Sequence, residues 1–515
     1  MTEAAQEENS SRARGGEDSV VEAFGIRGLY GYRSISLSSE FAATILIARN
    51  GTGKTTLLGA LDAFLRQQFS RLRDLDFEEI YCKIRGIDHE LTLTRQDLDS
   101  FLDVAPGEEF LNEFVKFSRG LESSPTLVFR FLSEEWPSLK ADFRSAADNT
   151  TFAAILRTTD FNTRKAIDIC EKLSSGLLAR SPKLSAISET LQKVLAGFDI
   201  VYLPTYRRVE LALGKDSSEL PHRKKRPKFN VAAGSLFTGD IQFGLADISE
   251  RLSEMNTRIV SESNSGYRQI SANIINELID GSYERETDAN REIPSRDDLQ
   301  LFFSRLERSR RVESYPISIP NLDKIYSEDG VPDQSGKFLN YFLSQLGTVI
   351  RATTDIERSV QDFVSSCNKY LLSEEVSTLL PAVDLIVNGR LIDGKKLRLN
   401  RKDLKVHVES VPEGRQISLD ALSSGEKQMI SLFAKLFLYE GPKIVLIDEP
   451  ELSLSIDWQR HILVDVMNAP LCRQLIAITH SPFVFDNDLE PFARSLQLSA
   501  SAAVLSPVEG DDADE

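Results

Sequence analysis

The chain has 515 residues, of which 41% are apolar and 27% are charged, and its formal net charge is -17 at pH 7. This composition is typical of a soluble globular protein with room for two or three domains. The negative charge argues against broad, non-specific binding to nucleic acid, and the wide spacing of the four cysteines argues against a zinc ribbon or a disulfide framework.

The two ends of the chain are polar and acidic. Residues 1–18 and 498–515 therefore predict disordered tails, and the N-terminus does not read as a signal peptide. The longest apolar run, residues 41–48, is far too short to span a bilayer. We expect a cytoplasmic protein without membrane contact.

Between the tails, the order of motifs predicts three segments. The N-terminal half of a globular head covers residues 19–235, and its C-terminal half covers residues 376–497. A helical insertion at 236–375 separates the halves. The predicted fold class is α/β, with one head split in sequence by a helical, partly coiled-coil insertion.

The first chemical motif follows a short apolar strand. "ATILI" (43–47) predicts a buried strand, and "TTLLGALDAFLRQQ" (55–68) predicts an amphipathic helix. Between them, "ARNGTGKTT" matches the phosphate-binding pattern G-x-x-x-x-G-K-[ST], except that Ala48 replaces the first glycine. Alanine is tolerated there if its φ is negative. The alternative, a chance glycine-rich turn, is disfavoured by the strand-loop-helix context.

In such a loop, backbone N–H groups and the helix N-terminus cradle an anion. Lys54 neutralises the β- and γ-phosphate oxygens, and the Thr55 hydroxyl can ligate Mg²⁺. The residues that we expect to bind ATP here are Asn50, Gly51, Gly53, Lys54, Thr55 and Thr56.

The rest of the N-terminal half carries weaker signals. Residues 110–200 look mostly helical and are assigned to the head. Arg207 and Arg208 follow an apolar strand, so they contact phosphate, contact a partner, or form a helix-capping salt bridge. The basic run at 223–228 binds nucleic acid or an acidic partner, or is a solvated loop; the loop is the preferred interpretation.

The insertion contains two apolar stripes with heptad spacing. Apolar residues recur in steps of 4 and 3, which is the pattern of a coiled-coil seam. The first stripe comprises Ile241, Leu245, Ile248, Leu252, Met255 and Ile259, and resumes after a break near Gly266 with Ile270, Ile274 and Leu278. The second comprises Phe342, Leu346, Val349, Thr353, Ile356, Val360, Phe363 and Cys367.

Two such stripes predict an antiparallel helical hairpin of roughly 50 Å, at about 1.5 Å per residue. The alternative is a compact helical lobe. The charged stretch 281–335, with one helix at 297–311, is a candidate tip or partner surface.

The C-terminal half repeats the pattern of a strand followed by polar residues. Strands at 384–410 lead to "LSSGEKQ" (422–428), which opens a helix with an anion-binding end. "KIVLIDEP" (443–450) is an apolar strand that ends in Asp448, a candidate Mg²⁺ ligand, and Glu449, placed to orient or deprotonate water. A further apolar strand, "QLIAITHSP" (474–482), ends in His480. All these polar residues should reach one carboxyl edge of the sheet.

Taken together, these motifs resemble the ABC-type ATPase heads of the RecF and SMC class. The resemblance identifies a Walker A at 48–55, a signature at 422–426, a Walker B at 444–449 and a switch histidine at 480. It implies that Ser423 and Gly425 contact the γ-phosphate bound by a second subunit, and hence a head-to-head homodimer or higher homo-oligomer with sandwiched ATP. Two positions depart from the pattern, since Ser424 replaces a common glycine and Ser455 stands where histidine is usual.

A narrower resemblance rests on "GIRGLYGYRSISL" (25–37), "VYLPTYRRVEL" (201–211) and "THSPFVFDNDLEPFARSL" (479–496). These stretches are similar to the ATPases of Septu-type and retron-associated anti-phage defence, which work with a separate HNH nuclease. The resemblance implies that Arg33 reaches the nucleotide, although a surface charge is the alternative. Only 35 residues follow His480 and the five histidines are scattered, so we expect no nuclease within this chain.

The expected function is slow, dimer-dependent ATP hydrolysis that controls a separate effector. Glu449 positions the attacking water, while His480 and the opposing Ser423 meet the γ-phosphate. Two other hypotheses stay open: an ATPase of DNA repair or chromosome maintenance that clamps DNA directly, and an ATP-gated scaffold without turnover. Nucleic acid would be bound through the partner or through the run at 223–228.

Overall fold

The structure is a computed structural model that divides into two compact units. The first unit comprises Met1–Gln242 with Gly441–Glu515, and the second comprises Phe243–Glu440; each is described by itself. The structure describes residues 14–49, 51–102, 117, 121, 125–136, 139, 149–204, 245–280, 293–308, 320–326, 333–372, 386–387, 390–391, 394–411, 413–418, 421–451 and 454–500. Asn50, Arg207, Arg208 and the basic run 223–228 lie outside these ranges.

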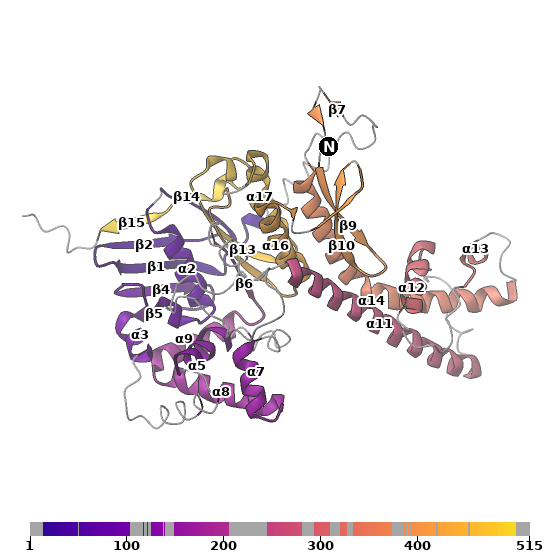
Figure 1. Ribbon diagram of the computed structural model, residues 1–515, viewed down its shortest axis with the longest axis horizontal. Helices are drawn as coiled ribbons and strands as arrows, with labels where there is room; N and C mark the ends of the chain where they lie inside the picture. The colour runs from indigo at the N-terminus through magenta and orange to yellow at the C-terminus, as the bar shows by residue number, and fades with distance from the viewer. Residues whose placement is uncertain are drawn as a thin grey trace, which may run out of the picture. The chain divides into compact units, whose positions relative to one another are not determined.

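A five-stranded parallel sheet in the first unit carries the strands of the predicted motifs (Figure 1). Its order is β14 (Ala493–Ser495), β3 (Ala43–Ile47), β13 (Cys472–Thr479), β12 (Lys443–Asp448) and β6 (Asp199–Leu203). The strands predicted at 43–47, before Asp448 and before His480 all form. Every residue of β12 is buried, as expected for a parallel strand covered on both faces.

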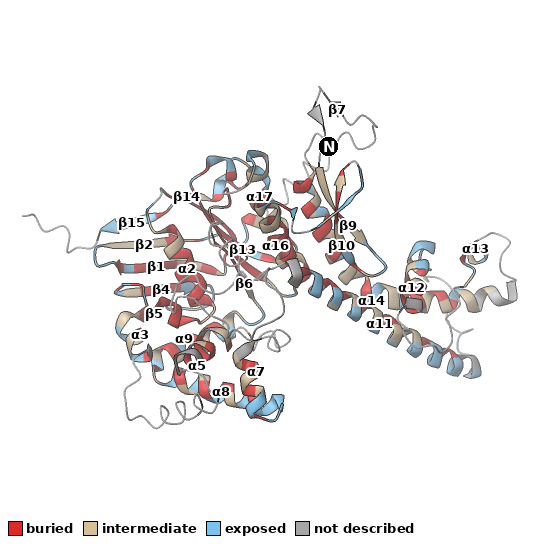
Figure 2. Ribbon diagram, viewed as in Figure 1, coloured by how far each residue is buried: buried red, intermediate tan, exposed pale blue. Residues whose placement is uncertain are grey.

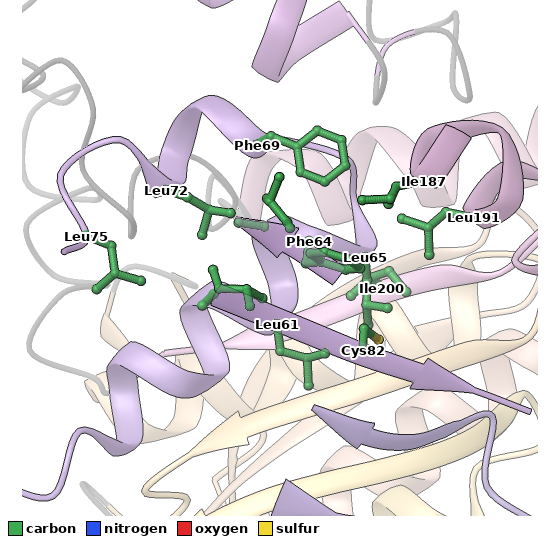
Figure 3. Close-up of a cluster of buried hydrophobic side chains, with 14 of the residues drawn as sticks. Leu61, Phe64, Leu65, Phe69, Leu72, Leu75, Cys82, Ile187, Leu191 and Ile200 are labelled. Carbon is green, nitrogen blue, oxygen red and sulfur yellow. The ribbon is translucent and has the colours of Figure 1, made fainter. Parts of the chain in front are cut away.

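An antiparallel sheet accompanies it in the first unit. Its order is β15 (Gln497–Ala500), β2 (Arg33–Ser38), β1 (Val21–Leu29), β4 (Glu79–Ile84) and β5 (Leu91–Thr94). Helix α2 (Lys54–Leu65) packs on β12 and β6 of the parallel sheet and on β1 of this one. Figure 3 shows apolar side chains of the core that these elements share. Each buried aliphatic or aromatic side chain contributes about 1.5–3 kcal/mol of hydrophobic stabilisation.

Helices and short turns complete the first unit, and the predicted helical character of 110–200 holds for the residues described there. They are η1 (Phe69–Leu72), α3 (Arg95–Leu102), α5 (Pro125–Arg130), the π-helix η2 (Phe131–Glu135), α7 (Thr150–Thr158), α8 (Thr163–Ala179), α9 (Pro182–Val194), α17 (Ile456–Asn468), η6 (Pro482–Val484) and η7 (Glu490–Phe492). The starts of α7, α8 and α9 are fixed by the side chains of Asn149, Asn162 and Ser181, which accept hydrogen bonds from backbone N–H groups.

Some residues of both predicted tails take part in the fold of the first unit. Arg14 donates to the carbonyl oxygens of Asn468 and Ala469, 2.8 and 3.0 Å away, and so caps the end of α17. At the other end, residues 497–500 form β15 and pair with β2. Both ends therefore gain backbone or side-chain partners that are distant in sequence.

Gln474 joins the two sheets of the first unit. Its fully buried side chain lies on β13, and its Oε1 accepts hydrogen bonds from the backbone N–H groups of Val20 and Val21, at 3.0 and 2.8 Å. Its Nε2 donates to the carbonyl of Val21 and to the hydroxyl of Ser39, both at 2.9 Å. Because β13 ends at Thr479, this junction also fixes the strand that presents His480.

The second unit contains two long helices that run side by side (Figure 1). Its elements are α11 (Leu245–Asp280), α12 (Arg296–Arg308), α13 (Leu322–Ile325), α14 (Asp333–Leu371), β7 (Ile386–Val387), β8 (Arg390–Leu391), β9 (Gly394–Asn400), β10 (Lys405–Val411), β11 (Gln416–Ile417) and α16 (Ser424–Leu438). Ile248 and Leu252 line one small hollow with Phe363, whereas Ile270 and Ile274 share a core with Leu346. The two helices are therefore antiparallel, as predicted.

The interruption of the first stripe near Gly266 does not break α11. A Cβ atom at this glycine would lie only 2.7 Å from both γ-carbons of Val349, so the missing side chain allows α14 to approach closely. Helix α12 packs on the same pair through Leu299, Phe302 and Phe303, which is a feature of the compact-lobe alternative. Figure 2 shows the buried inner faces and exposed outer faces of α11 and α14.

The division of the chain differs from the predicted boundary at residue 376. Strands β9 and β10 and helix α16 group with the arm helices, because α14 packs against both β9 and α16. The unit boundary accordingly falls at Glu440 and Gly441 rather than before the strands. In the part of the chain that the structure describes, no helix is long and apolar enough to cross a membrane.

Replacing Gln474 with leucine should destabilise the first unit by about 3–5 kcal/mol, because it removes the partners of several buried backbone and hydroxyl groups at once. Urea unfolding measures this loss. Arg473→Leu, at the exposed neighbouring position on β13, is the matched control and should change stability by less than about 0.5 kcal/mol. Equal effects of the two substitutions would show that the buried junction does not hold the sheets together.

Candidate functional site

The phosphate-binding loop has the backbone conformation that its sequence requires. Gly51 and Gly53 have φ of 81° and 95°, a region that favours glycine. A Cβ atom at Gly53 would also lie 3.4 Å from the side chain of Ile35. Ala48 is absent from the positive-φ residues, and its N–H donates to the carbonyl of Thr479 at 3.2 Å. The condition set for an alanine at the first position is thus met.

Lys54 and Glu449 form the ion pair at the centre of the site. The Lys54 Nζ lies 2.6 Å from the Glu449 Oε1, and the two side chains are 4% and 15% exposed. A buried ammonium group needs a negative partner, since burying an isolated charge is very costly. The pair brings the Walker A lysine and the predicted catalytic carboxylate together from segments almost four hundred residues apart in sequence.

The parallel sheet explains how the pair forms. Strands β3, β13 and β12 are adjacent and parallel, so their carboxyl ends meet at one edge. The loop before Lys54 follows β3, His480 follows β13, and Glu449 follows β12. Glu449 has a φ of 52°, which is rare for a residue with a side chain and turns the chain sharply after the strand.

Asp448 and Thr55 are the predicted Mg²⁺ ligands. Asp448 is only 1% exposed at the end of β12, and Thr55 is half-buried in the first turn of α2, next to Lys54. One carboxylate and one hydroxyl suit Mg²⁺, which takes oxygen ligands and usually completes its shell with phosphate oxygens and water. Within the described ranges, no group of three or more His, Cys, Asp or Glu side chains could hold a metal by itself. The donors present fit an ion that arrives with a nucleotide.

His480 lies beside the ion pair but contacts a different carboxylate. Its Nδ1 is 2.7 Å from the Oε1 of Glu451 and 4.0 Å from the Oε1 of Glu449. Its side chain is 43% exposed, so the ring reaches the surface of the site. Glu451 was not among the predicted site residues. Its signal in the sequence was only its position, two residues after Glu449.

Arg33 reaches the phosphate-binding loop from β2. Its Nη1 donates to the carbonyl of Gly51 at 3.2 Å, and its Nε is buried without a hydrogen-bond partner among the described residues. The guanidinium lies over the rings of Tyr30 and Tyr32, 5.6 and 5.2 Å from their centroids. Both tyrosines are exposed, so a cation with two aromatic rings borders the loop.

Ser423 and Gly425 belong to the second unit, at the start of α16. Ser423 is the N-cap: its hydroxyl accepts from the N–H of Glu426 at 3.3 Å, and its own N–H donates to the Glu426 carboxylate at 2.6 Å. Gly425 is buried within the first turn. The capping box confirms that the predicted helix opens at this motif, and the local chemistry of its N-terminus suits an anion.

Ser455 and the four cysteines have structural roles. Ser455, which replaces a common histidine, caps α17 by accepting from the N–H of Trp458 at 3.4 Å. The four cysteines are buried and unpaired with one another. Burial raises the pKa of the thiols of Cys170 and Cys472 to about 12, so they stay protonated and are poor nucleophiles at neutral pH.

The chain is similar to several known proteins. It is 24% identical over 477 residues to the retron Vc95 probable ATPase of Vibrio cholerae serotype O1 biovar El Tor, a match that covers 88% of this chain and 70% of that protein. Among solved structures, an Smc head bound to the C-winged helix domain of ScpA gives a TM-score of 0.18 at 16% identity, covering 32% of this chain and 48% of that chain.

An Smc head domain with a coiled coil and joint derived from Pyrococcus yayanosii gives a TM-score of 0.28 at 14% identity, covering 93% of this chain and 96% of that chain. A family model described as "AAA domain, putative AbiEii toxin, Type IV TA system" matches residues 228–486, which is half of the chain. The chain therefore belongs to this AAA-domain family.

Proposed function

We propose that this protein is an ABC-type ATPase that binds ATP with Mg²⁺, hydrolyses it slowly, and uses the cycle to control a separate effector nuclease. The observation that carries the proposal is the 2.6 Å contact between Lys54 and Glu449. It brings a phosphate-binding lysine and a candidate general base to one sheet edge. Membership of the AAA-domain family supports nucleotide binding.

The residues divide the work as follows. Lys54 and the loop N–H groups bind the β- and γ-phosphates, with Arg33 as an additional cation. Thr55 and Asp448 hold Mg²⁺, which supplies charge neutralisation at the phosphate oxygens. Tyr30 offers an exposed ring against which a base can stack. The site thus has candidate groups for the phosphates, the metal ion and the base.

Glu449 has two roles that exclude each other in time. Paired with Lys54, it neutralises a buried cation. When triphosphate takes the lysine, Glu449 is released to accept a hydrogen bond from water. It takes the water proton as the oxygen bonds to the γ-phosphorus and the bond to the ADP oxygen breaks. Catalysis here is mainly positioning and charge stabilisation.

The dimer and the effector are further parts of the proposal. The capped start of α16 presents an exposed Ser423, and a signature motif of this type acts on nucleotide held by another subunit. For the effector, the retron Vc95 relative is named a probable ATPase, and the defence ATPases that the sequence resembles work with a separate HNH nuclease. We infer a partner of that type for this chain.

Glu449→Gln should remove hydrolysis while strengthening ATP binding. Removing the negative charge of Glu449 weakens one internal interaction that competes with phosphate for Lys54, so affinity should rise about tenfold, or roughly 1.4 kcal/mol. Turnover should fall by about 100-fold or more, because the general base is gone. Calorimetric titration and phosphate release measure the two effects.

Lys54→Ala should weaken ATP binding by about 100-fold or more, since the site then holds Glu449 without its cation. Calorimetric titration measures this loss.

The matched control for Glu449→Gln is Glu490→Gln, which removes an exposed carboxylate and should behave as wild type. Wild-type turnover in the Glu449 variant would refute its role as base. An ATP affinity of Glu449→Gln equal to that of wild type would refute the competition between Glu449 and phosphate.

Ser423→Asp should block ATP-dependent dimerisation. Aspartate caps a helix as well as serine does, so α16 stays intact, but the added charge would face the triphosphate of the second subunit. The matched variant Ser423→Asn keeps a neutral cap and should still dimerise. In a Glu449→Gln background with ATP, light scattering should give twice 57.7 kDa for the asparagine variant only. Dimers of both variants would remove Ser423 from the interface.

The effector part of the proposal has its own test. A tagged chain expressed with its genomic neighbours should copurify with the product of an adjacent nuclease gene, and the yield should change between ATP and no nucleotide. Copurification with no nuclease in either condition would contradict this part and leave the ATPase proposal standing.

A further inference from the structure

Glu451 is a buried carboxylate whose hydrogen bonds converge on the end of β13. Its side chain is 5% exposed. Its Oε2 accepts from the hydroxyl of Thr479 at 2.8 Å, and its Oε1 accepts from the backbone N–H of His480 at 3.0 Å. The same Oε1 lies 2.7 Å from the His480 Nδ1. A buried carboxylate is stable only when such donors surround it.

These contacts determine which ring nitrogen of His480 is available. A carboxylate oxygen is an acceptor, so the Nδ1 that faces it carries the proton. Nε2 is then the nitrogen left for other groups, and the ring is 43% exposed. The orientation of a functional histidine is commonly set through its other nitrogen in this way.

The backbone after β12 separates the two carboxylates. The N–H of Glu449 donates to the carbonyl of Ile478 at 2.8 Å, and its φ of 52° turns the chain. Glu449 then pairs with Lys54, whereas Glu451, two residues later, reaches the end of β13. The His480 Nδ1 is 4.0 Å from Glu449 and 2.7 Å from Glu451, so Glu451 is the carboxylate that contacts the ring.

A further layer holds Glu451 itself. The Nε2 of Gln459, on α17, donates to the carbonyl oxygen of Glu451 at 3.3 Å, and the Gln459 Oε1 accepts from the hydroxyl of Ser481 at 3.0 Å. The N–H of Ser481 donates to the hydroxyl of Thr479 at 3.0 Å. Helix α17 thus holds the backbone of Glu451, while the end of β13 supplies the donors to its carboxylate.

We propose that Glu451 is a positioning residue for hydrolysis, which fixes the Nδ1–H form of His480 and so directs Nε2 to the γ-phosphate. This inference rests on the proposed ATPase function. Glu451 does not contact the nucleotide; its effect passes through the imidazole. The inference assigns separate tasks to the two glutamates of the "DEPE" sequence at 448–451.

Turnover and ring protonation together test the inference. Glu451→Ala should lower kcat by about 10–100-fold with little change in KM, since Lys54 still binds phosphate. Glu451→Gln keeps an acceptor for Nδ1–H and should stay within about threefold of wild type. Thr479→Val removes the hydrogen bond from the Thr479 hydroxyl to Glu451 but keeps both contacts between His480 and Glu451. It should therefore lower kcat less than Glu451→Ala does. Glu490→Ala is the surface control.

A spectroscopic readout needs neither nucleotide nor turnover. In protein labelled with ¹⁵N-histidine there are five rings, and His480→Gln identifies the signal of His480. At about pH 8, where an ordinary histidine is neutral, wild type and Glu451→Gln should show the Nδ1–H form. Glu451→Ala should show loss of that form. Thermal unfolding of each variant checks folding.

The outcomes separate the inference from the proposed function. An alanine variant with wild-type kcat, or with an unchanged His480 signal, would overturn the positioning role, as would a glutamine variant as slow as the alanine variant. A wild-type protein without ATP turnover would instead refute the proposed function, whatever the ring signals show.

Discussion

The ion pair between Lys54 and Glu449 is the interaction on which the site depends. A nearly buried ammonium group, 4% exposed, has a carboxylate 2.6 Å away, and this charge balance must be kept in every state of the protein. Triphosphate can replace the carboxylate because it brings negative charge of its own. The proposed cycle is therefore an exchange of one counter-ion for another, and the exchange releases Glu449 for chemistry.

The fold serves this exchange by placing three strand ends together. Adjacent parallel strands β3, β13 and β12 deliver the lysine, the histidine and the glutamate to one edge. Gln474 ties β13 to the antiparallel sheet, and α2 fills the space between the sheets. The left-handed backbone at Glu449 separates two nearby carboxylates. Glu449 contacts the Lys54 ammonium group, and Glu451 contacts the His480 ring. The order of the strands in the sheet thus sets the relative positions of Lys54, His480 and Glu449.

Much of this arrangement was predictable because short stretches of the sequence determine it. The buried strands are recognisable as apolar runs, and "LSSGEKQ" (422–428) is recognisable as the start of a helix. Glu451 and Gln474 were not predictable, because their roles depend on which strands become neighbours. The division at Glu440 and Gly441 differs from the predicted boundary at 376 for the same reason: β9 and α16 pack on α14, and such long-range packing is not encoded in composition. Asn50 and the run 223–228 lie outside the described residues and stay predictions.

The most direct test is a structure of the protein with Mg²⁺ and a non-hydrolysable ATP analogue. The measured quantity is the distance between the Lys54 Nζ and the Glu449 Oε1, which is 2.6 Å in the present structure. We predict that Nζ moves to a phosphate oxygen and that the two side chains separate beyond hydrogen-bond reach. An analogue bound elsewhere, or bound with the ion pair still closed, would contradict the exchange.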